Sequence, residues 1–242
     1  MKIAVAQTKP VTGNIESNIN NHITLINLAA SNGADIIIFP ELSLTGYEPS
    51  LAKELATGIN DSRFDVFQKL SNEKQITIGA GVPTSAETGI NITMVLFEPN
   101  KPRQANSKMY LHEDEEPFFV SGENLPGLYI NNTSIALAIC YEISIPQHAE
   151  KAHKTGAQLY VASVAKTVKG VEKAWAGLSE TAGKYGMTVL MSNSVGMCED
   201  GLCGGKSAAW NSRGELLGHL NDTDEGIIVL DTDIDKIYLF IE

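Results

Sequence analysis

Three segments of the chain place reactive side chains directly after strand-like apolar runs. Glu41 follows the Ile-rich run 35–39, within FPELSLTGY. Cys140 ends the run 134–140, within LAICYE. Between them, Lys108 stands in SKMYL, ahead of the acidic stretch HEDEEPFF. Because sites in α/β folds form where strands end, a thiol at such a position is a candidate nucleophile.

Each feature also has an ordinary structural explanation when it is taken alone. Glu41 could simply meet water where a strand ends, and a run of charges is usually a solvated turn. A free cysteine is commonly just a buried core residue. A thiolate nucleophile needs a base, and donors for the oxyanion that forms. The chain has no G-x-S-x-G motif, and none of its five histidines gives a strong partner signal for Cys140.

Composition narrows the class of protein. The 242 residues suffice for one large domain, and 43% hydrophobic with 19% charged residues is an ordinary globular balance. The formal net charge of −11 disfavours nucleic-acid binding, because phosphates repel it. No apolar run approaches the roughly 20 residues needed to span a bilayer. The start, MKIAVAQTKP, is typical of a first strand rather than a signal peptide. Three cysteines fit a reducing cytoplasm, so we expect a cytoplasmic protein.

Hydrophobic periodicity predicts alternating strands and helices. The expected strands are Lys2–Gln7, Asp35–Phe39, Gln75–Gly79, Ile92–Phe97, Ser134–Cys140, Gln158–Ala162, Thr188–Asn193, Ser207–Asn211 and Gly226–Asp231. The expected helices follow Gly13 to about Ala30, cover Ser62–Leu70 and Ile145–Thr155, and run from Trp175 to Tyr185. Asn14 is the expected N-cap of the first helix. This alternation indicates an α/β fold with a mixed sheet arrangement.

The three segments, in this order, resemble the carbon–nitrogen hydrolase family, also called the nitrilase superfamily, in its amidase-like branch. The resemblance begins at KIAVAQ and reaches GGKS and the closing strands, so residues 1–242 are expected to form one domain of this kind. It implies a single-domain, four-layer α-β-β-α sandwich. It also implies a homodimer or a higher homo-oligomer paired through outer helices. The helix after Cys140 and the apolar segment Ile237–Ile241 are the expected interface parts.

The resemblance implies a Glu–Lys–Cys triad. Glu41 would be the general base, Lys108 the cation that stabilises the tetrahedral intermediate, and Cys140 the nucleophile. A second glutamate follows the lysine in the family; Glu115 fits it best, and Glu116 is the competing assignment. The implied reaction is hydrolysis of a non-peptide carbon–nitrogen bond through a cysteine thioester, and the expected substrate is a small amide that yields an acid and ammonia or an amine. The implied partner is a small-molecule amide, and no metal or organic cofactor is required.

Several residues that follow or flank these motifs are candidates for the substrate pocket. They are Tyr47, Phe119, Tyr141, Glu142 and Lys166, and the backbone N–H of Tyr141 would complete the oxyanion hole by analogy. Lys166 could receive a substrate carboxylate or be a solvated strand-end lysine. Some relatives that act on carbamoyl amino acids carry an arginine shortly after the nucleophile. The sequence CYEISIP has none, which disfavours an acidic substrate bound in that way.

Three other functions remain open on the sequence. The same thioester could pass its acyl group to an amine, or the fold could serve a non-catalytic binding role. A cysteine hydrolase assisted by His112 or His148 is the third. The preference among nitriles, amides and carbamoyl compounds, and the natural substrate, are not fixed by the sequence.

Overall fold

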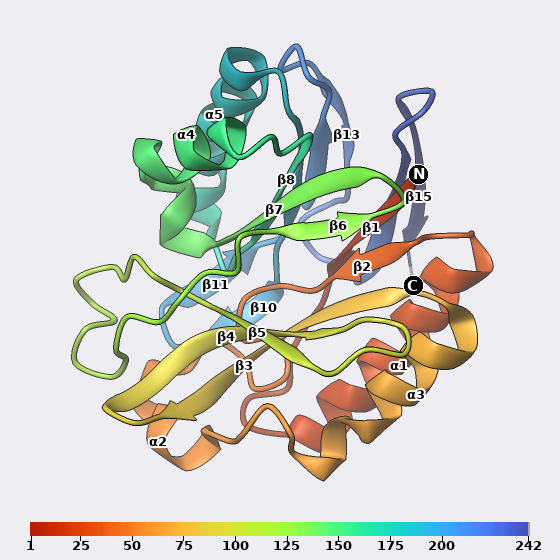
Figure 1. The fold of residues 1–242 in the computed structure, drawn as a ribbon. Helices are drawn as coiled ribbons and strands as arrows, with labels where there is room; N and C mark the ends of the chain where they lie inside the picture. The colour runs from red at the N-terminus through yellow and green to blue at the C-terminus, as the bar shows by residue number, and fades with distance from the viewer. Residues whose placement is uncertain (242) are drawn as a thin grey trace.

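Two mixed β-sheets lie face to face, with helices on their outer sides, in a computed structural model that describes residues 1–241 (Figure 1). The seven-stranded sheet is ordered β15 (Lys236–Ile241), β14 (Gly226–Asp231), β1 (Lys2–Gln7), β2 (Ile36–Ile38), β3 (Thr77–Ala86), β4 (Gly89–Phe97) and β5 (Gln104–Ser107). The six-stranded sheet is ordered β13 (Leu216–His219), β12 (Ala208–Trp210), β9 (Thr188–Ser192), β8 (Leu159–Ser163), β7 (Thr133–Ile139) and β6 (Leu128–Ile130). A separate hairpin pairs β10 (Val195–Cys198) with β11 (Gly201–Gly204).

The helices form the two outer layers. Helices α1 (Ile15–Ser31) and α3 (Asp65–Lys74) lie against the seven-stranded sheet, and α4 (Pro146–Lys154) and α5 (Val168–Tyr185) against the other (Figure 1). The remaining turns are α2 (Ala52–Leu55), η1 (Pro49–Leu51), η2 (Ser62–Phe64) and η3 (Cys140–Ser144). The expected four-layer α-β-β-α fold class is therefore confirmed.

Alternation along the central strands explains the layering. In β1, Ile3 and Val5 belong to the core cluster that joins the two sheets, whereas Ala4 and Ala6 belong to the cluster beneath α1 and α3. Successive side chains of a strand point to opposite faces, so a strand apolar on both faces needs cover on both sides. The continuous apolar runs in the sequence reflect this double burial.

Serine side chains link the facing sheets. Ser163 Oγ, at the end of β8, donates to the carbonyl of Phe39 at 2.8 Å, and Ser192 Oγ, at the end of β9, donates to the carbonyl of Ala6 at 2.5 Å. Because both strand ends belong to the six-stranded sheet and both carbonyls to the other, these bonds fix the sheets at the edge where β2 ends.

The element boundaries differ from expectation in places. Asn14 caps α1 by accepting from the backbone N–H of Ser17, as expected. Helix α5 begins at Val168, well before the predicted start at Trp175. Its first two turns carry few apolar residues, so the apolar stripe used for the prediction begins only at Trp175. The strands β5, β6, β10, β11, β13 and β15 were not predicted. Several are short or polar, as in the QANS of β5, and lack a clear alternating pattern.

Across residues 1–241, no helix combines the length and apolar character that crossing a membrane requires.

Candidate active site

The loop that carries Glu41 leaves β2 and turns sharply over β3. Leu42 has a left-handed φ of 50°, which is unusual for a bulky residue. Gly81 of β3 lies directly beneath, and a Cβ there would come within 2.6 Å of the Pro40 carbonyl oxygen. The absence of a side chain at Gly81 therefore allows the loop to lie close to the sheet and buries Glu41.

A buried histidine fixes the same loop. His22 of α1 contacts Ser43 Oγ through Nε2 at 2.9 Å, and its Nδ1 lies 2.7 Å from the carbonyl of Asn18. Burial lowers the pKa of His22 to about 3, although the bond to Asn18 opposes that shift. The imidazole is therefore neutral near pH 7, donates to Asn18 and accepts from Ser43. No motif around His22 indicates this role, because a histidine on an apolar helix face is usually a core residue.

Lys108 joins two carboxylates in the interior. Its Nζ lies 2.8 Å from Glu41 Oε1 and 2.6 Å from Glu115 Oε1, and its side chain is fully buried. Burial alone would lower the pKa of Lys108, but the surrounding carboxylates and thiol outweigh it and raise that pKa. The lysine is therefore a permanent cation in a dry site.

Glu115 is the second glutamate of this cluster by position. Its Oε1 also accepts from Tyr47 Oη at 3.0 Å, and its Oε2 accepts from the backbone N–H of His112 at 2.8 Å. The neighbouring Glu116 is exposed. The structure thus places Glu115 and Tyr47 beside Lys108, and leaves Glu116 at the surface.

Cys140 begins η3, where β7 turns sharply. Its φ of 44° is left-handed, a strained conformation of the kind found at nucleophile positions. The residue is 8% exposed. Burial raises the pKa of its thiol to about 11 and the charge of Glu41 adds to the rise, whereas Lys166 and Lys108 lower it. The resting group is therefore a thiol that must lose a proton before it can attack.

Glu41 has one carboxylate oxygen available for that proton. Oε1 is bound by Lys108, while Oε2 is buried and makes no hydrogen bond of ordinary geometry to another protein group. Burial raises the pKa of Glu41, whereas the charge of Lys108 and the adjacent Cys140 thiol lower it. A carboxylate desolvated in this way, next to a buried thiol, is suited to general-base chemistry.

Glu142 links the backbone of the segments that carry Lys108 and Cys140. Its Oε2 accepts from Ile139 N at 2.8 Å, and its Oε1 accepts from Met109 N at 2.7 Å and from Asn124 Nδ2 at 3.0 Å. Ile139 precedes Cys140 and Met109 follows Lys108, so this fully buried carboxylate fixes both. The structure thus directs both oxygens of Glu142 to two backbone N–H groups and one side-chain amide, and its expected contact with substrate stays a prediction.

Lys166 lies beside Cys140. Its backbone is fixed by Asn193, whose Oδ1 accepts from Lys166 N at 2.8 Å and whose Nδ2 donates to Lys166 O at 3.2 Å. The charge of Cys140 raises the pKa of Lys166, and burial opposes that rise. Two cations, Lys108 and Lys166, therefore act on the same thiol.

A hollow of about 570 Å³ lies between the segment after Cys140 and α5. Tyr141, His112 and Lys166 line it, so two of the expected pocket residues lie together. Phe119, by contrast, is 2% exposed and packs within the core that joins the sheets.

Neither candidate histidine is placed as a base for Cys140. The Nδ1 of His112 lies 3.3 Å from Asp114 Oδ2, and its ring packs edge-on against Tyr141. The Nδ1 of His148 lies 2.8 Å from Tyr160 Oη, and its Nε2 lies 3.6 Å from Glu142. Both rings are thus directed to other partners.

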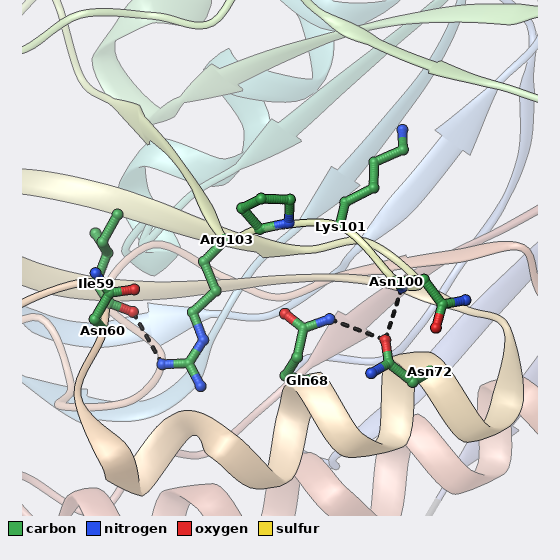
Figure 2. A pocket seen from close by; sticks show the side chains of 8 residues that line it. Ile59, Asn60, Gln68, Asn72, Asn100, Lys101 and Arg103 are labelled. Atoms are coloured by element: carbon green, nitrogen blue, oxygen red, sulfur yellow. Dashed lines mark hydrogen bonds between the residues drawn. The ribbon is translucent and has the colours of Figure 1, made fainter.

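A second hollow, of about 460 Å³, lies between α3 and the turn that joins β4 to β5 (Figure 2). Asn72 Oδ1 accepts there from Gln68 Nε2 at 3.1 Å and from Asn100 N at 2.8 Å (Figure 2). Arg103 Nη1 donates to the carbonyl of Ile59. None of the lining residues belongs to the cluster around Cys140.

Within the described part of the chain, no group of three or more histidine, cysteine, aspartate or glutamate residues is arranged to hold a metal ion.

The family model for carbon–nitrogen hydrolases matches residues 2–242. The chain belongs to this family. Among solved structures, this carbon–nitrogen hydrolase is similar to the amidase of Nesterenkonia sp. AN1, with a TM-score of 0.85 at 24% identity over 96% of this chain and 92% of the other. One structure of that amidase shows acrylamide added at its active-site cysteine, and another is a complex with butyramide.

The proteins that resemble this chain in sequence differ in length. The glutamine-dependent NAD(+) synthetase of Thermotoga maritima is 25% identical over 98% of this chain, and the alignment covers 42% of that protein. The chain thus spans under half the length of that curated relative. The (R)-stereoselective amidase of a Pseudomonas species is 21% identical over 98% of this chain and 86% of its own length. At these identities the comparisons give the family and the fold, and the substrate is a separate question.

Proposed function

We propose that this carbon–nitrogen hydrolase cleaves a small amide to an acid and ammonia or an amine, through a thioester on Cys140. The buried cluster of Glu41, Lys108 and Glu115 beside a thiol with left-handed backbone carries this proposal. Burying one lysine with two carboxylates is costly unless the charges are paired and used. A structural core would gain more from apolar residues of similar size.

Acylation begins with proton transfer from the Cys140 thiol to the free Oε2 of Glu41. The sulfur attacks the amide carbon, and Lys108 Nζ with the backbone N–H of Tyr141 stabilises the negative charge that develops on oxygen. The tetrahedral intermediate collapses when the carbon–nitrogen bond breaks. Glu41 returns the proton to the leaving nitrogen, which departs as ammonia or an amine.

Deacylation uses the same groups in reverse. Glu41 takes a proton from water, the oxygen attacks the thioester carbon, and the same two donors stabilise the second intermediate. The carbon–sulfur bond then breaks, the acid leaves, and the proton on Glu41 returns to sulfur. Glu115, held by Lys108 and Tyr47, positions the lysine and the substrate nitrogen throughout.

The expected pocket residues divide by role. Tyr141 and Lys166, which line the hollow beside η3, would contact the substrate, whereas Tyr47 and Phe119 would act from the core between the sheets. Glu142 would act indirectly, by holding the backbone N–H groups of Met109 and Ile139, which are next to Lys108 and Cys140. A substrate with an anionic group is compatible with Lys166 even though no arginine follows Cys140.

The direct test measures ammonia release by wild type, Cys140→Ala and the control Cys198→Ser. The substrates are aliphatic amides such as butyramide, glutamine and other ω-amides, nitriles and carbamoyl compounds. Glutamine is included because several relatives are glutamine-dependent synthetases. We expect release by wild type and by Cys198→Ser, and none by Cys140→Ala. Release that persists in Cys140→Ala would contradict the mechanism.

Hydroxylamine in the same assay tests the acyl-transfer alternative. If the thioester passes its acyl group to amines in preference to water, hydroxamate formation would exceed hydrolysis even at low hydroxylamine concentration. We expect hydrolysis to exceed hydroxamate formation.

We also propose that the protein is cytoplasmic and that it assembles as a homodimer or a larger homo-oligomer.

A further inference from the structure

The β10–β11 hairpin carries a pair of thiols that the hydrolase mechanism does not use. The Sγ atoms of Cys198 and Cys203 lie 3.4 Å apart across the hairpin. Both are free cysteines, and Cys203 is buried while Cys198 is partly exposed. They are separated by five positions, a spacing that gives no known motif in the sequence. Only the antiparallel pairing of the hairpin brings them together.

The hairpin lies next to the site through both of its strands. At its tip, the backbone N–H of Glu199 donates to the carbonyl of Tyr47 at 3.2 Å. On the other strand, Gly204 N donates to the carbonyl of Lys166 at 2.8 Å, and Cys203 bridges to Thr167. A covalent link between the strands would therefore fix a segment that contacts both Tyr47 and Lys166.

We propose that Cys198 and Cys203 form a reversible dithiol–disulfide site that is oxidised by a low-molecular-weight disulfide of the glutathione type. Cys198 attacks first, because it is the more accessible of the two and receives a hydrogen bond from the Cys203 thiol. Cys203 then resolves the mixed disulfide. The site is separate from Cys140, and the inference does not depend on the hydrolytic function.

The acid–base properties of the pair fit this order. The hydrogen bond from Cys203 lowers the pKa of Cys198, although burial opposes that shift. The same hydrogen bond and burial raise the pKa of Cys203. A thiolate with a lowered pKa is the attacking species in thiol–disulfide exchange. Once Cys198 is capped, the hydrogen bond that holds the proton on Cys203 is weakened.

The reaction balances without a further oxidant. The Cys198 thiolate attacks one sulfur of glutathione disulfide and releases one glutathione thiolate, which takes up a proton. The Cys203 thiol loses its proton to solvent and attacks Cys198 Sγ, which releases the second glutathione. One glutathione disulfide is reduced to two thiols, and two protein thiols are oxidised to one disulfide.

The experiment incubates the wild-type protein with glutathione disulfide, then denatures it and alkylates all free thiols with N-ethylmaleimide. Peptide mapping reads residues 198 and 203 separately from Cys140. We expect a single tryptic peptide that contains both cysteines, has lost two hydrogens and carries no maleimide, and that regains both hydrogens on treatment with dithiothreitol. Maleimide on both cysteines, or glutathione retained on Cys198 beside an alkylated Cys203, would overturn the proposal.

Two serine variants test the order of attack. In Cys203→Ser, which lacks the resolving thiol, glutathione should accumulate on Cys198. In Cys198→Ser, Cys203 should stay reduced and be alkylated after denaturation. Glutathione on Cys203 in the second variant, with none on Cys198 in the first, would reverse the assignment and overturn it.

Discussion

At the residue scale, burial rather than sequence position separates two adjacent glutamates. Glu115 accepts from Lys108, Tyr47 and a backbone N–H, whereas Glu116 faces solvent. The sequence offered both for the same role. A carboxylate with three donors in a dry site fixes the charge and orientation of Lys108, and an exposed one has no comparable effect.

The pair Glu115→Gln and Glu116→Gln tests this difference. Removing the charge from Glu115 should lower kcat/KM for the best amide by roughly 10²-fold, since positioned acid–base groups contribute about 10²–10⁴. The Glu116 variant should stay within about 2-fold of wild type, because exposed charges contribute little. Steady-state ammonia release measures both. Equal losses in the two variants would contradict the assignment of Glu115.

The second cation beside Cys140 leads to a prediction about pH. Lys166 lowers the pKa of a thiol that burial raises to about 11, so Lys166→Met should raise that pKa further. Alkylation of Cys140 by iodoacetamide should then be slower at any pH between 7 and 10, with its inflection moved upward.

The matched control for that experiment is Lys173→Met. Lys173 lines the same hollow and is exposed, so its removal should leave the alkylation profile of Cys140 unchanged. If both lysine variants show the wild-type profile, Lys166 does not act on the thiol in solution.

At the element scale, the Glu41 loop is held from the helical layer. His22 of α1 reaches through to Ser43, and stacks on Phe39 with ring centroids 3.9 Å apart. The helix therefore does more than cover the sheet, because its neutral imidazole accepts from the loop that carries the base. A charged imidazole could not accept from Ser43 and would be desolvated.

This arrangement makes stability depend on pH. The pKa of His22 falls from 6.5 to about 3 on folding, so the unfolded chain takes up a proton that the folded chain excludes. The stabilisation is present above about pH 6.5 and is lost as pH falls from there toward 3, by about 1.4 kcal/mol per pH unit. Urea unfolding from pH 7.5 to 5 should show this decline.

His22→Gln isolates the contribution of His22 from that of other groups. Glutamine cannot be protonated here, so its free energy of unfolding should depend less on pH over that range, although it is lower at pH 7.5. The buried His148, whose pKa burial also lowers, contributes in the same direction in both proteins. If the free energy of unfolding falls with pH equally in wild type and His22→Gln, His22 is protonated in the folded protein and the prediction is wrong.

The elements that the sequence predicted are those with strong local patterns. Doubly buried strands such as β1 and the capped helix α1 carry continuous apolar runs or a 3.6-residue stripe, and Glu41 and Cys140 stand at strand ends in recognisable motifs. Contacts between distant segments could not be predicted in this way. The bond of Ser43 to His22 and the backbone bonds of Glu142 depend on how the layers are brought together, and the nearby Cys198 and Cys203 meet only through the pairing of β10 with β11.

At the scale of the whole molecule, the last strand is more fully covered by its own chain than its apolar sequence indicated. The apolar segment 237–241 was expected to need a partner's surface. It forms β15, which pairs with β14, and Ile237, Tyr238 and Phe240 are partly buried against their own chain. Only Leu239 and Ile241 keep large exposed fractions, 45% and 57%. The chain thus covers much of the segment by itself.

The expected homodimer remains testable through those two side chains. If β15 contributes to the interface, sedimentation at micromolar concentration should give a dimer or larger species for wild type, and Leu239→Asp should shift it toward monomer, since a buried unpaired carboxylate in an interface is costly. Met197→Asp is the matched control, because Met197 is a comparably exposed apolar residue on the separate β10–β11 hairpin. An oligomer that persists in Leu239→Asp would leave α4 as the remaining expected part of the interface, whereas a wild-type monomer would contradict the assembly expected from the resemblance.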